Sequence, residues 1–401
     1  MRIGIIGGGA AGLIAAIKAE QLGMQVTLFD ANTRLGRKLS ATGSGRCNIS
    51  NLQAAANTYH SDSPESLQKC FQNLPGSIVQ DFLHELGIPT TSTPDGWVYP
   101  RSFSGSNVVN ILGNNLQNTK VYLNSLITSI EKKDNVYLLQ TQDNSVNHAF
   151  EQVIIACGSP ANPQLGARSV LQKELDKLGH HLLPIKPALA PIETDTAHFH
   201  KLQGVRLDAG ITLMQDNEEV FETFGNIIFT KWGLNGPGVM DISHLIEAKH
   251  TQQYHLRINF IAGFEEDIIR AFEDNKKAHL SPSSLLMAYL PQKVCAFILK
   301  QNELEKVKRS SQMSKQQKEA LINALKNQSV QVRGVRGFKH AQASVGGIPL
   351  SEIDPQSMRS RFNSGLYIVG EMVNVLGPCG GYNLHWAILS ALIAAQAAST
   401  A

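Results

Sequence analysis

The chain has 401 residues, of which 42% are hydrophobic and 6% aromatic, and its formal net charge at pH 7 is +3. This size and composition are typical of a globular protein with about two to three domains. No run of about 18 apolar residues is present, so no membrane span is expected. The five cysteines form no C-x-x-C pair, which argues against a metal cage or a dithiol relay and favours the reducing cytoplasm.

The first expected element is a buried strand over residues 3–6, followed by Gly7-Gly8-Gly9-Ala10-Ala11-Gly12 and a helix rich in Ala, Ile and Leu. Strand, tight turn and helix are the context in which a G-x-G-x-x-G motif binds a dinucleotide. Gly7 permits the turn, Gly9 lets a diphosphate approach the backbone, and Gly12 lets helix and strand pack closely. The unpaired N–H groups of the first helical turn then face the phosphates. Because the chain starts directly with this strand, we expect no signal peptide.

A second apolar strand, over residues 25–29, ends on Asp30. An acid about 20 positions after the glycine motif is expected to hold a ribose 2′-hydroxyl. Since a carboxylate would repel a 2′-phosphate, we do not expect NADP in this site. The two strands, the motif and Asp30 together predict a dinucleotide site.

Residues 31–51 are rich in Gly, Ser and cations and show no amphipathic period, which predicts a long loop. Long loops inside a domain are usually functional. Arg37 and Lys38 are expected to neutralise a diphosphate, and the glycines up to Gly45 let backbone amides approach a flat ligand. A plain surface loop is the alternative.

The segment that follows predicts helices over residues 64–86 and then a small sheet. Residues 120–156 alternate apolar and polar side chains around two turns, which is a β-meander pattern. The meander ends in a buried strand followed by the small residues Ala156-Cys-Gly158.

The pattern changes near residue 191. Short strands and turns over residues 191–261 predict a β domain, which contains an irregular Gly-rich loop at 229–238. Residues 264–327 are expected to form helices inserted between strands of this domain. Residues 330–338 return to strand, and residues 343–349 are expected to turn back toward the first domain.

Basic residues are concentrated between Lys306 and Lys339, where nine of them accompany a single acid, Glu319. The remainder of the chain is therefore net negative. Such asymmetry favours a polyanionic partner. A solvated helical face is the alternative.

The C-terminal region predicts a second ligand-binding element. A buried strand over residues 365–371 ends in Gly370-Glu371, where an acid can hold sugar or ribityl hydroxyls. A helix that begins near Gly381 would direct its positive end at a flavin and stabilise the anionic reduced ring. A plain capped C-terminal helix is the alternative. Because the two motifs lie at opposite ends of the chain, they predict a cofactor domain built from both ends.

At these motifs the chain resembles the HI0933-like (YhiN/BaiN-type) FAD-binding oxidoreductases from end to end. The resemblance is carried by Gly7–Gly12, Gly36–Lys38, Gly45–Asn51, Gly233–Pro237, Ala343–Gly347, Gly370-Glu371 and Gly380–Asn383. The G-R-C-N and G-G-Y-N pieces are specific to this family. Two positions depart from its pattern: Asn374 stands where relatives commonly have an acid, and Ala156-Cys-Gly-Ser159 replaces A-T-G-G.

The resemblance implies an α/β fold with a Rossmann-like FAD-binding domain split between residues 1–190 and 345–401. A β-barrel-like domain would comprise residues 191–263 and 328–344, and a small basic helical domain residues 264–327. The cofactor implied is FAD, with NAD(P)H as a transient reductant, since no second G-x-G-x-x-G follows a strand. The residues implied to contact FAD are Gly7, Gly9, Ala10, Ala11, Gly12, Asp30, Arg37, Lys38, Gly45, Arg46, Cys47, Asn48, Ile127, Ala156, Gly158, Gly370, Glu371, Gly380, Gly381, Tyr382 and Asn383.

The family is linked to reduction of a uridine in large-subunit ribosomal RNA to dihydrouridine, to aminoacetone-type amine oxidation and to a reductive role in bile-acid metabolism. We expect an FAD-dependent oxidoreductase, with uridine reduction in 23S rRNA as the leading hypothesis. A small-molecule oxidase or reductase is one alternative, and a non-enzymatic flavin-binding module is another.

Uridine reduction needs a hydride at one end of the C5–C6 double bond and an acid that protonates the other. Cys47 is the first candidate acid, with Tyr382 and His385 in reserve. The adjacent Arg46 is expected to lower the pKa of the Cys47 thiol. A buried, purely structural cysteine is the alternative.

We expect a cytoplasmic protein with no metal site and no membrane association, while the sequence leaves the oligomeric state open. An RNA partner would meet the basic segment through its phosphates. The residues expected to contact it are Lys306, Lys308, Arg309, Lys315, Lys318, Arg333, Arg336 and Lys339.

Overall fold

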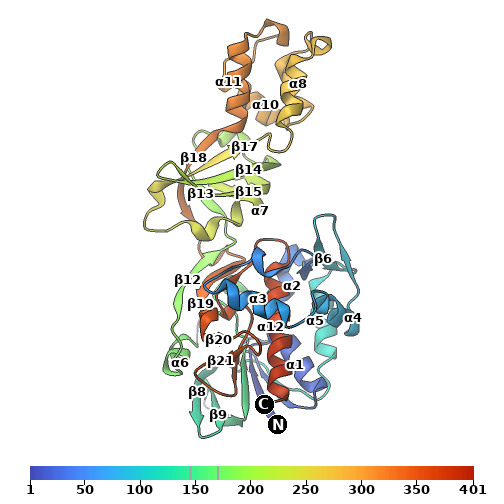
Figure 1. Cartoon of the computed structure of the whole chain (residues 1–401), viewed down its shortest axis with the longest axis vertical. Helices are drawn as coiled ribbons and strands as arrows, with labels where there is room; N and C mark the ends of the chain where they lie inside the picture. The colour runs from blue at the N-terminus through green and yellow to red at the C-terminus, as the bar shows by residue number, and fades with distance from the viewer. Residues whose placement is uncertain (144–146, 169–170) are drawn as a thin grey trace. The chain divides into compact units, whose positions relative to one another are not determined.

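The computed structural model describes residues 1–143, 147–168 and 171–401, and these divide into two units (Figure 1). Unit 1 comprises residues 1–186 and 342–401, and unit 2 comprises residues 187–341. The chain thus leaves unit 1 once and returns to it, so that both chain ends belong to unit 1. One of the two turns expected in the β-meander, at Asp143-Asn144, falls partly outside the described residues.

Unit 1 is built on a seven-stranded sheet in the order β20-β21-β22-β11-β1-β2-β7. The parallel strands are β22 (Leu366–Ile368), β11 (Gln152–Ile155), β1 (Arg2–Ile6), β2 (Gln25–Phe29) and β7 (Lys120–Tyr122). The antiparallel edge strands are β20 (Ile353–Asp354) and β21 (Arg359–Ser360). The central strands read as continuous apolar runs because parallel strands are buried on both faces.

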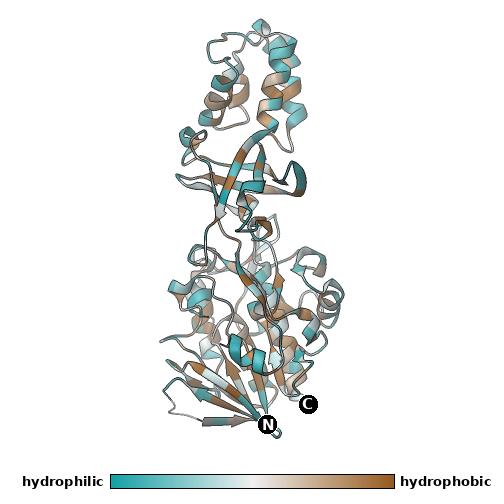
Figure 2. Ribbon diagram, turned by 90° about the vertical axis from the view of Figure 1, so that its left-hand side faces the viewer, coloured by the Kyte–Doolittle hydropathy of each residue, from teal (hydrophilic) through white to brown (hydrophobic). Residues whose placement is uncertain are grey.

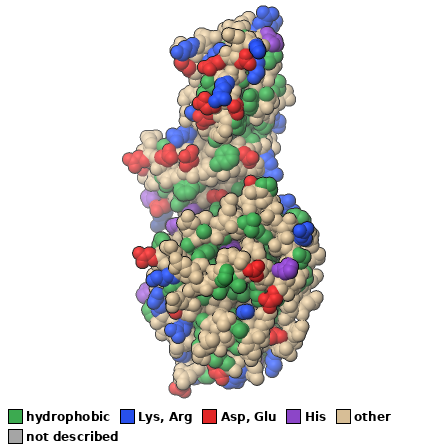
Figure 3. Space-filling view, turned by 45° about the vertical axis from the view of Figure 1, so that its right-hand side comes forward, with side chains coloured by type: hydrophobic (Ala, Val, Ile, Leu, Met, Phe, Trp, Pro, Cys, Tyr) green, Lys and Arg blue, Asp and Glu red, His purple; other side chains and the backbone are tan. Residues whose placement is uncertain are grey.

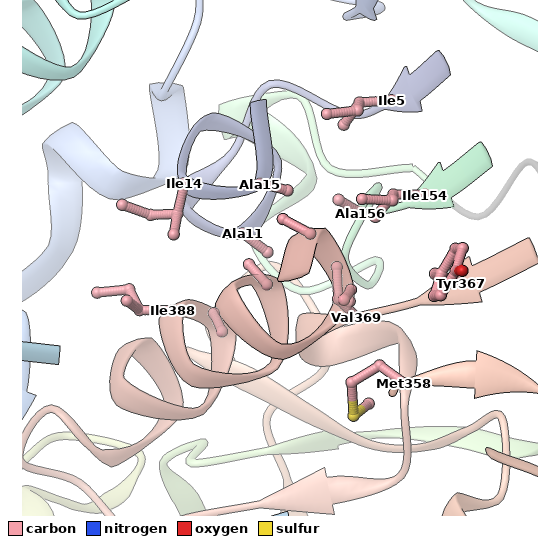
Figure 4. Close-up of a cluster of buried hydrophobic side chains, with 14 of the residues drawn as sticks. Ile5, Ala11, Ile14, Ala15, Ile154, Ala156, Met358, Tyr367, Val369 and Ile388 are labelled. Atoms are coloured by element: carbon pink, nitrogen blue, oxygen red, sulfur yellow. The ribbon is translucent and has the colours of Figure 1, made fainter. Parts of the chain in front are cut away.

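Helices α1 (Ala10–Gln21) and α12 (Tyr382–Ser399) pack against each other beside this sheet. Ala11, Ile14 and Ala15 of α1 face α12, where Ile388 lies in the same buried cluster (Figure 4). A Cβ added to Gly370 would lie only 3.2 Å from the Cβ of Ala11, so small residues allow the two ends of the chain to approach. The predicted Rossmann-like domain built from both ends is confirmed.

The other helices of unit 1 are α2 (Arg37–Ala41), α3 (Pro64–Gln72), α4 (Ile78–Glu85), α5 (Gly105–Asn114) and α6 (Gln172–Lys177). One smaller sheet is the meander of β8 (Ile127–Lys133), β9 (Val136–Thr141) and β10 (Asn147–Phe150). A second has three strands, β3 (Ser50–Asn51), β6 (Trp97–Pro100) and β5 (Thr90–Ser92). Two more are strand pairs, β4 (His60–Ser61) with β23 (Val375–Leu376) and β12 (Leu183–Ala188) with β19 (Ala343–Gly347).

Two elements of unit 1 differ from the predictions. The expected loop at 31–51 contains α2, whose five residues are too few to show an amphipathic period. The expected turn at 343–349 contains strand β19. Its glycines Gly346 and Gly347 have φ of 96° and 94°, so the turn-like composition reflects its last two residues rather than the whole segment.

Unit 2 contains a closed barrel, which confirms the predicted β-barrel-like domain. The strands in barrel order are β13 (Ile192–Thr194), β16 (Gly233–Asn235), β15 (Glu218–Phe229), β14 (Arg206–Gln215), β17 (Tyr254–Asn259) and β18 (Gln328–Val335). Strands β14 and β15 are longer than the short strands expected, and they meet at a turn where Asp216 and Asn217 both have positive φ.

Strand β16 lies inside the segment that was predicted to be too irregular for a strand. Gly233 has a φ of 151°, and a Cβ there would overlap the carbonyl oxygen of Ile192 on the neighbouring strand. Glycine therefore marks a close approach of two backbones rather than a break in the sheet.

Helices of unit 2 share a hydrophobic core with the barrel, and apolar residues recur on both the strands and the helices (Figure 2). The helices are α7 (Pro237–Met240), α8 (Glu265–Glu273), α9 (Pro282–Met287), α10 (Gln292–Gln301) and α11 (Lys315–Lys326). Within the described ranges, no helix combines the length and apolar character needed to cross a membrane.

Candidate active site

The glycine motif forms an open cradle between β1 and α1. Gly7 has a φ of 107°, and a Cβ on Gly12 would overlap the carbonyl oxygen of Gly7, so both positions require glycine. Gly9 is the N-cap of α1 and has no side chain to cap the helix. A Cβ at Gly9 would meet nothing within 4 Å. The N–H groups of the first turn of α1 therefore border open space, as they do at helix N-termini that bind phosphates.

Asp30 ties the end of β2 to this cradle. Its buried carboxylate accepts hydrogen bonds from the backbone N–H of Gly8 at 2.7 Å and from the backbone and side-chain nitrogens of Asn32 at 2.7 and 2.9 Å. The acid is thereby held at the carboxyl ends of two adjacent parallel strands, which is where ligands bind in open α/β sheets.

A pocket opens beside Asp30. It is lined, among others, by Gly7, Asn32, Ile127, Cys157 and Arg168. Ile127, one of the residues implied to contact FAD, is among the residues that line this pocket. Burial raises the pKa of the Cys157 thiol to about 12, so this residue lines the pocket as a neutral group. Sequence reasoning missed Asn32 and Arg168, because neither belongs to a recognisable motif.

The two cations expected near the diphosphate are engaged with other groups. The Lys38 ammonium lies 2.7 Å from Oε2 of Glu371, whose Oε1 accepts from the backbone N–H of Ser344 at 2.9 Å. Arg37 donates to the side-chain oxygen of Asn32 at 3.1 Å. The Lys38–Glu371 pair therefore joins the N-terminal and C-terminal motifs.

The segments Gly45–Asn51 and Gly380–Asn383, which contain the G-R-C-N and G-G-Y-N motifs, interlock. The side-chain amide of Asn51 donates to the carbonyl of Gly380 at 2.9 Å, and the Ser50 hydroxyl lies 2.9 Å from Nδ1 of His385. A Cβ on Gly381 would overlap the carbonyl oxygen of Ser50. The structure thus brings together the predicted residues from the two ends of the chain.

The start of α12 is held by side chains of the same region. Asn383 accepts from the backbone N–H of Gly377 at 3.0 Å and donates to its carbonyl at 2.8 Å. The Tyr59 hydroxyl donates to the carbonyl of Tyr382 at 2.8 Å. Gly381, the N-cap, has a φ of 94° and no side-chain cap, so the first turn of α12 presents backbone N–H groups.

Cys47 is fully buried and has a φ of 60°. Burial raises the pKa of its thiol to about 11, while a hydrogen bond with the Thr42 side chain acts in the opposite direction. The expected lowering of this pKa by Arg46 is therefore wrong. The exposed Arg46 guanidinium instead lies over the Tyr99 ring, 5.6 Å from its centroid.

His385 is also buried, and burial lowers the pKa of its imidazole to about 4. Its ring stacks on Phe71 with a centroid distance of 5.9 Å. His385 is therefore neutral near pH 7 and bonded to Ser50. Tyr382 is slightly more accessible, with 8% of its surface exposed.

Several residues of the basic segment have acidic partners within unit 2. Lys326 pairs with Glu265 at 2.7 Å, and Arg333 pairs with Asp195 at 2.9 Å. Acidic and basic side chains alternate over the helical part of this unit (Figure 3). Other contacts of the segment include Lys315–Glu319, Arg336–Glu193, Arg336 with His340, Arg336 over Trp232, and Lys318 with the carbonyl of Phe272.

Three residues of the segment, Lys306, Lys308 and Arg309, are exposed and have no acidic partner among the residues that the structure describes. Lys339 is exposed and has an interaction partner. The basic segment therefore has fewer cations without an acidic partner than its composition indicates.

The family model described as "HI0933-like protein Rossmann domain" matches residues 1–397. The chain belongs to this family. The HI0933-like chain is 30% identical to the 3-dehydro-bile acid delta(4,6)-reductase of Clostridium scindens over 99% of both chains. It is 28% identical to the ribosomal RNA dihydrouridine synthase of Escherichia coli over 98% of this chain and 96% of the relative. The synthase of the same name from Haemophilus influenzae is 27% identical over 98% of both chains.

Among solved structures, the HI0933-like chain is similar to the 3-ketosteroid-delta4-(5alpha)-dehydrogenase from Rhodococcus jostii, with 13% identity, a TM-score of 0.49 and coverage of 99% and 96% of the two chains. A flavocytochrome c3 fumarate reductase shows 13% identity and a TM-score of 0.48, with coverage of 100% of this chain and 78% of that one. The HI0933-like protein is an FAD-dependent oxidoreductase. The open cradle at Gly9 and the anchored Asp30 fit this cofactor.

Proposed function

We propose that this HI0933-like protein reduces a carbon–carbon double bond, and that its substrate is a uridine in 23S ribosomal RNA. The relatives are named as a bile-acid delta(4,6)-reductase and as ribosomal RNA dihydrouridine synthases, and both names denote reduction of such a bond. The observation that carries the RNA assignment is the match, over nearly the whole chain, to synthases of the same name from two organisms.

FAD, when bound, supplies the hydride. We propose that its diphosphate lies at the N-terminus of α1, where Gly9 leaves open space, and that the nucleoside occupies the pocket beside Asp30 and Ile127. The flavin end would lie at the interlocked segments around Asn48 and Gly381. The other predicted contacts, including Lys38 and Glu371, remain part of this proposal.

The uridine gains a hydride at one carbon of its C5–C6 bond and a proton at the other, and no leaving group is released. We propose Cys47 as the proton donor, because a thiol with a pKa of about 11 keeps its proton at neutral pH. His385 is a weaker candidate, since a neutral imidazole bonded to Ser50 has no readily transferred proton. Tyr382 remains the reserve donor.

The electrons must be replaced after each turnover. We propose that NADH or NADPH visits the flavin transiently, since no second G-x-G-x-x-G motif follows a strand elsewhere in the sequence. The test is to add a reduced nicotinamide to the oxidised protein without oxygen. The absorbance of the flavin near its visible maximum should then decrease.

A small-molecule enone reductase is the second candidate function. It is favoured by the 30% identity to the bile-acid reductase, which covers 99% of both chains. The acidic partners of Lys326 and Arg333 also favour it, because they reduce the charge available for RNA.

Deletion of the gene, followed by mass spectrometry of nucleosides from purified 23S rRNA, tests the leading proposal. We expect loss of one dihydrouridine, restored by the wild-type gene. Unchanged dihydrouridine would contradict the RNA substrate. Flavin reoxidation by a 3-oxo-Δ4 steroid, together with unchanged rRNA, would support the second candidate instead.

A further inference from the structure

We propose that RNA phosphates are held by a basic face of unit 2 that the sequence pattern did not indicate. This face, called here the η4–α10 face, consists of the exposed residues His198, Lys201, Lys293, Lys300 and Gln301. It is formed by the 3-10 turn η4 (His200–Leu202) and helix α10. The inference rests on the proposed RNA substrate and names the surface that would bind it.

Helix α10 lies along the segment that contains η4, and contacts at both ends of the helix hold the two together. At one end, the Lys293 ammonium donates to the carbonyl of Gln203 at 3.3 Å. At the other, the Gln301 amide lies 3.0 Å from Nε2 of His198. Between them, the half-buried Phe297 contacts Phe199 with a ring-centroid distance of 5.4 Å. The cations are thus carried by packed elements rather than by a free loop.

Neither element contains an acid. Residues 196–207 include His198, His200, Lys201 and Arg206 but no Asp or Glu, and residues 292–302 include two lysines and no Asp or Glu. Across the described residues, the ion pairs of unit 2 involve other cations, so no carboxylate pairs with Lys201, Lys293 or Lys300. Among the described residues, the three lysines of this face therefore form no ion pair, whereas the charge of His198 interacts with that of Asp195.

Two of these lysines approach each other. The Lys300 ammonium lies close to Lys201 and lowers its pKa, because two neighbouring positive charges oppose each other's protonation. Two like charges at this range repel unless an anion lies between them. A phosphate offers several oxygens that can accept from both ammonium groups at once. Such contacts position a nucleic acid without reading its sequence.

The composition of the face favours RNA over a lipid surface. A membrane-binding surface needs exposed aromatic or aliphatic side chains that enter the lipid. The large hydrophobic residues that the described chain exposes include none from 196–207 or 292–302. The face is therefore suited to a hydrated polyanion.

The triple variant Lys201→Gln, Lys293→Gln, Lys300→Gln tests this assignment against a matched variant in unit 1, Lys69→Gln, Lys133→Gln, Lys173→Gln. Both remove three exposed charges. The probe is an unmodified 23S rRNA transcript, and binding is measured as a function of KCl concentration. Wild-type flavin content and melting temperature in both variants serve as the folding control.

Each phosphate contact contributes about 0.7–0.9 to the slope of log affinity against log salt concentration. We therefore expect the first variant to reduce the magnitude of this slope by about 2 to 3. At low salt it should also bind the transcript at least tenfold more weakly. The unit 1 variant should match wild type. An unchanged slope in the first variant would overturn the assignment, and so would wild-type protein that binds phosphatidylserine vesicles through these lysines but not RNA.

Failure of this inference differs from failure of the proposed function. If the deletion strain lacks its dihydrouridine while the triple variant keeps the wild-type slope, the surface is wrong and the function stands. If the deletion strain retains the modification and wild-type protein shows no salt-dependent RNA binding, both are wrong.

Discussion

The glycine cradle of unit 1 and the η4–α10 face of unit 2 are built in opposite ways. The cradle acts through its backbone: Gly7 and Gly12 are required by conformation and close packing, and Gly9 leaves the helix N-terminus open. The η4–α10 face acts through lysine side chains that form no ion pair with a carboxylate among the described residues. A site made from the backbone leaves a motif in the sequence, whereas a site made from unpaired charges is found only when the partners of every charge are known.

The largest effect is expected from a substitution of Gly12 in the glycine cradle. A valine there would overlap the carbonyl of Gly7, so Gly12→Val should destabilise the protein by about 3 kcal/mol or more and abolish FAD binding. The control is Gly9→Ala, whose Cβ meets nothing within 4 Å of the protein. It should keep the wild-type free energy of unfolding but bind FAD at least tenfold more weakly. Urea unfolding and FAD titration measure the two effects, and Gly12→Val with wild-type stability and FAD content would contradict the account.

Replacement of Cys47 separates chemistry from packing in the same unit. If its neutral thiol donates the proton, Cys47→Ala should lower the single-turnover rate constant of dihydrouridine formation about 100-fold while FAD content stays at the wild-type level. The measurement is dihydrouridine formed in single turnovers of the reduced protein. Unchanged turnover combined with a lower melting temperature would show that Cys47 only packs, as its complete burial also allows.

His385 predicts a pH dependence of stability. Its pKa is about 4 in the folded protein, below the usual value of 6.5, so between these values the unfolded chain binds the additional proton. Stability from this group is fully present above pH 6.5 and falls as pH decreases. Between pH 6.5 and pH 5, the free energy of unfolding of the His385→Gln variant should therefore fall by about 2 kcal/mol less than that of the wild-type protein. Urea unfolding at the two pH values measures this difference, and identical pH slopes would contradict the burial argument.

The smallest effect is expected at the ion pair between the two ends of the chain. The Lys38 and Glu371 side chains are 31% and 20% exposed, so Lys38→Met should cost less than about 1 kcal/mol of stability. Lys133→Met, which removes the more exposed Lys133–Glu131 pair, is the control. A loss of several kcal/mol for Lys38→Met alone would mean that charge, rather than the packing of α1 on α12, holds the ends together.

Much of unit 1 could be predicted because its signals are local. The glycine spacing, the apolar strand and Asp30 lie within 30 residues, and strand β2 has the predicted bounds. Strand β16 was missed because Gly233 satisfies a close approach to a strand about 40 positions away. The pKa of Cys47 was predicted in the wrong direction because the neighbouring Arg46 is visible in the sequence, whereas burial is not.

The charges of unit 2 were misjudged for a related reason. Lys326 lies in a basic run, but its partner Glu265 comes from a helix far away in the sequence. Conversely, Lys201 and Lys300 are separated by 99 positions and belong to no run, yet the fold brings their ammonium groups together. Local charge counts cannot distinguish these two cases, because pairing is decided by tertiary packing.

The most direct test of the account is a single-turnover reaction. Purified protein with its FAD reduced is mixed, without oxygen, with an unmodified 23S rRNA transcript, and flavin absorbance and dihydrouridine are followed together. The account predicts that the oxidised flavin spectrum returns as dihydrouridine forms, one for each flavin. A flavin that stays reduced in the presence of this RNA, with no dihydrouridine formed, would contradict it.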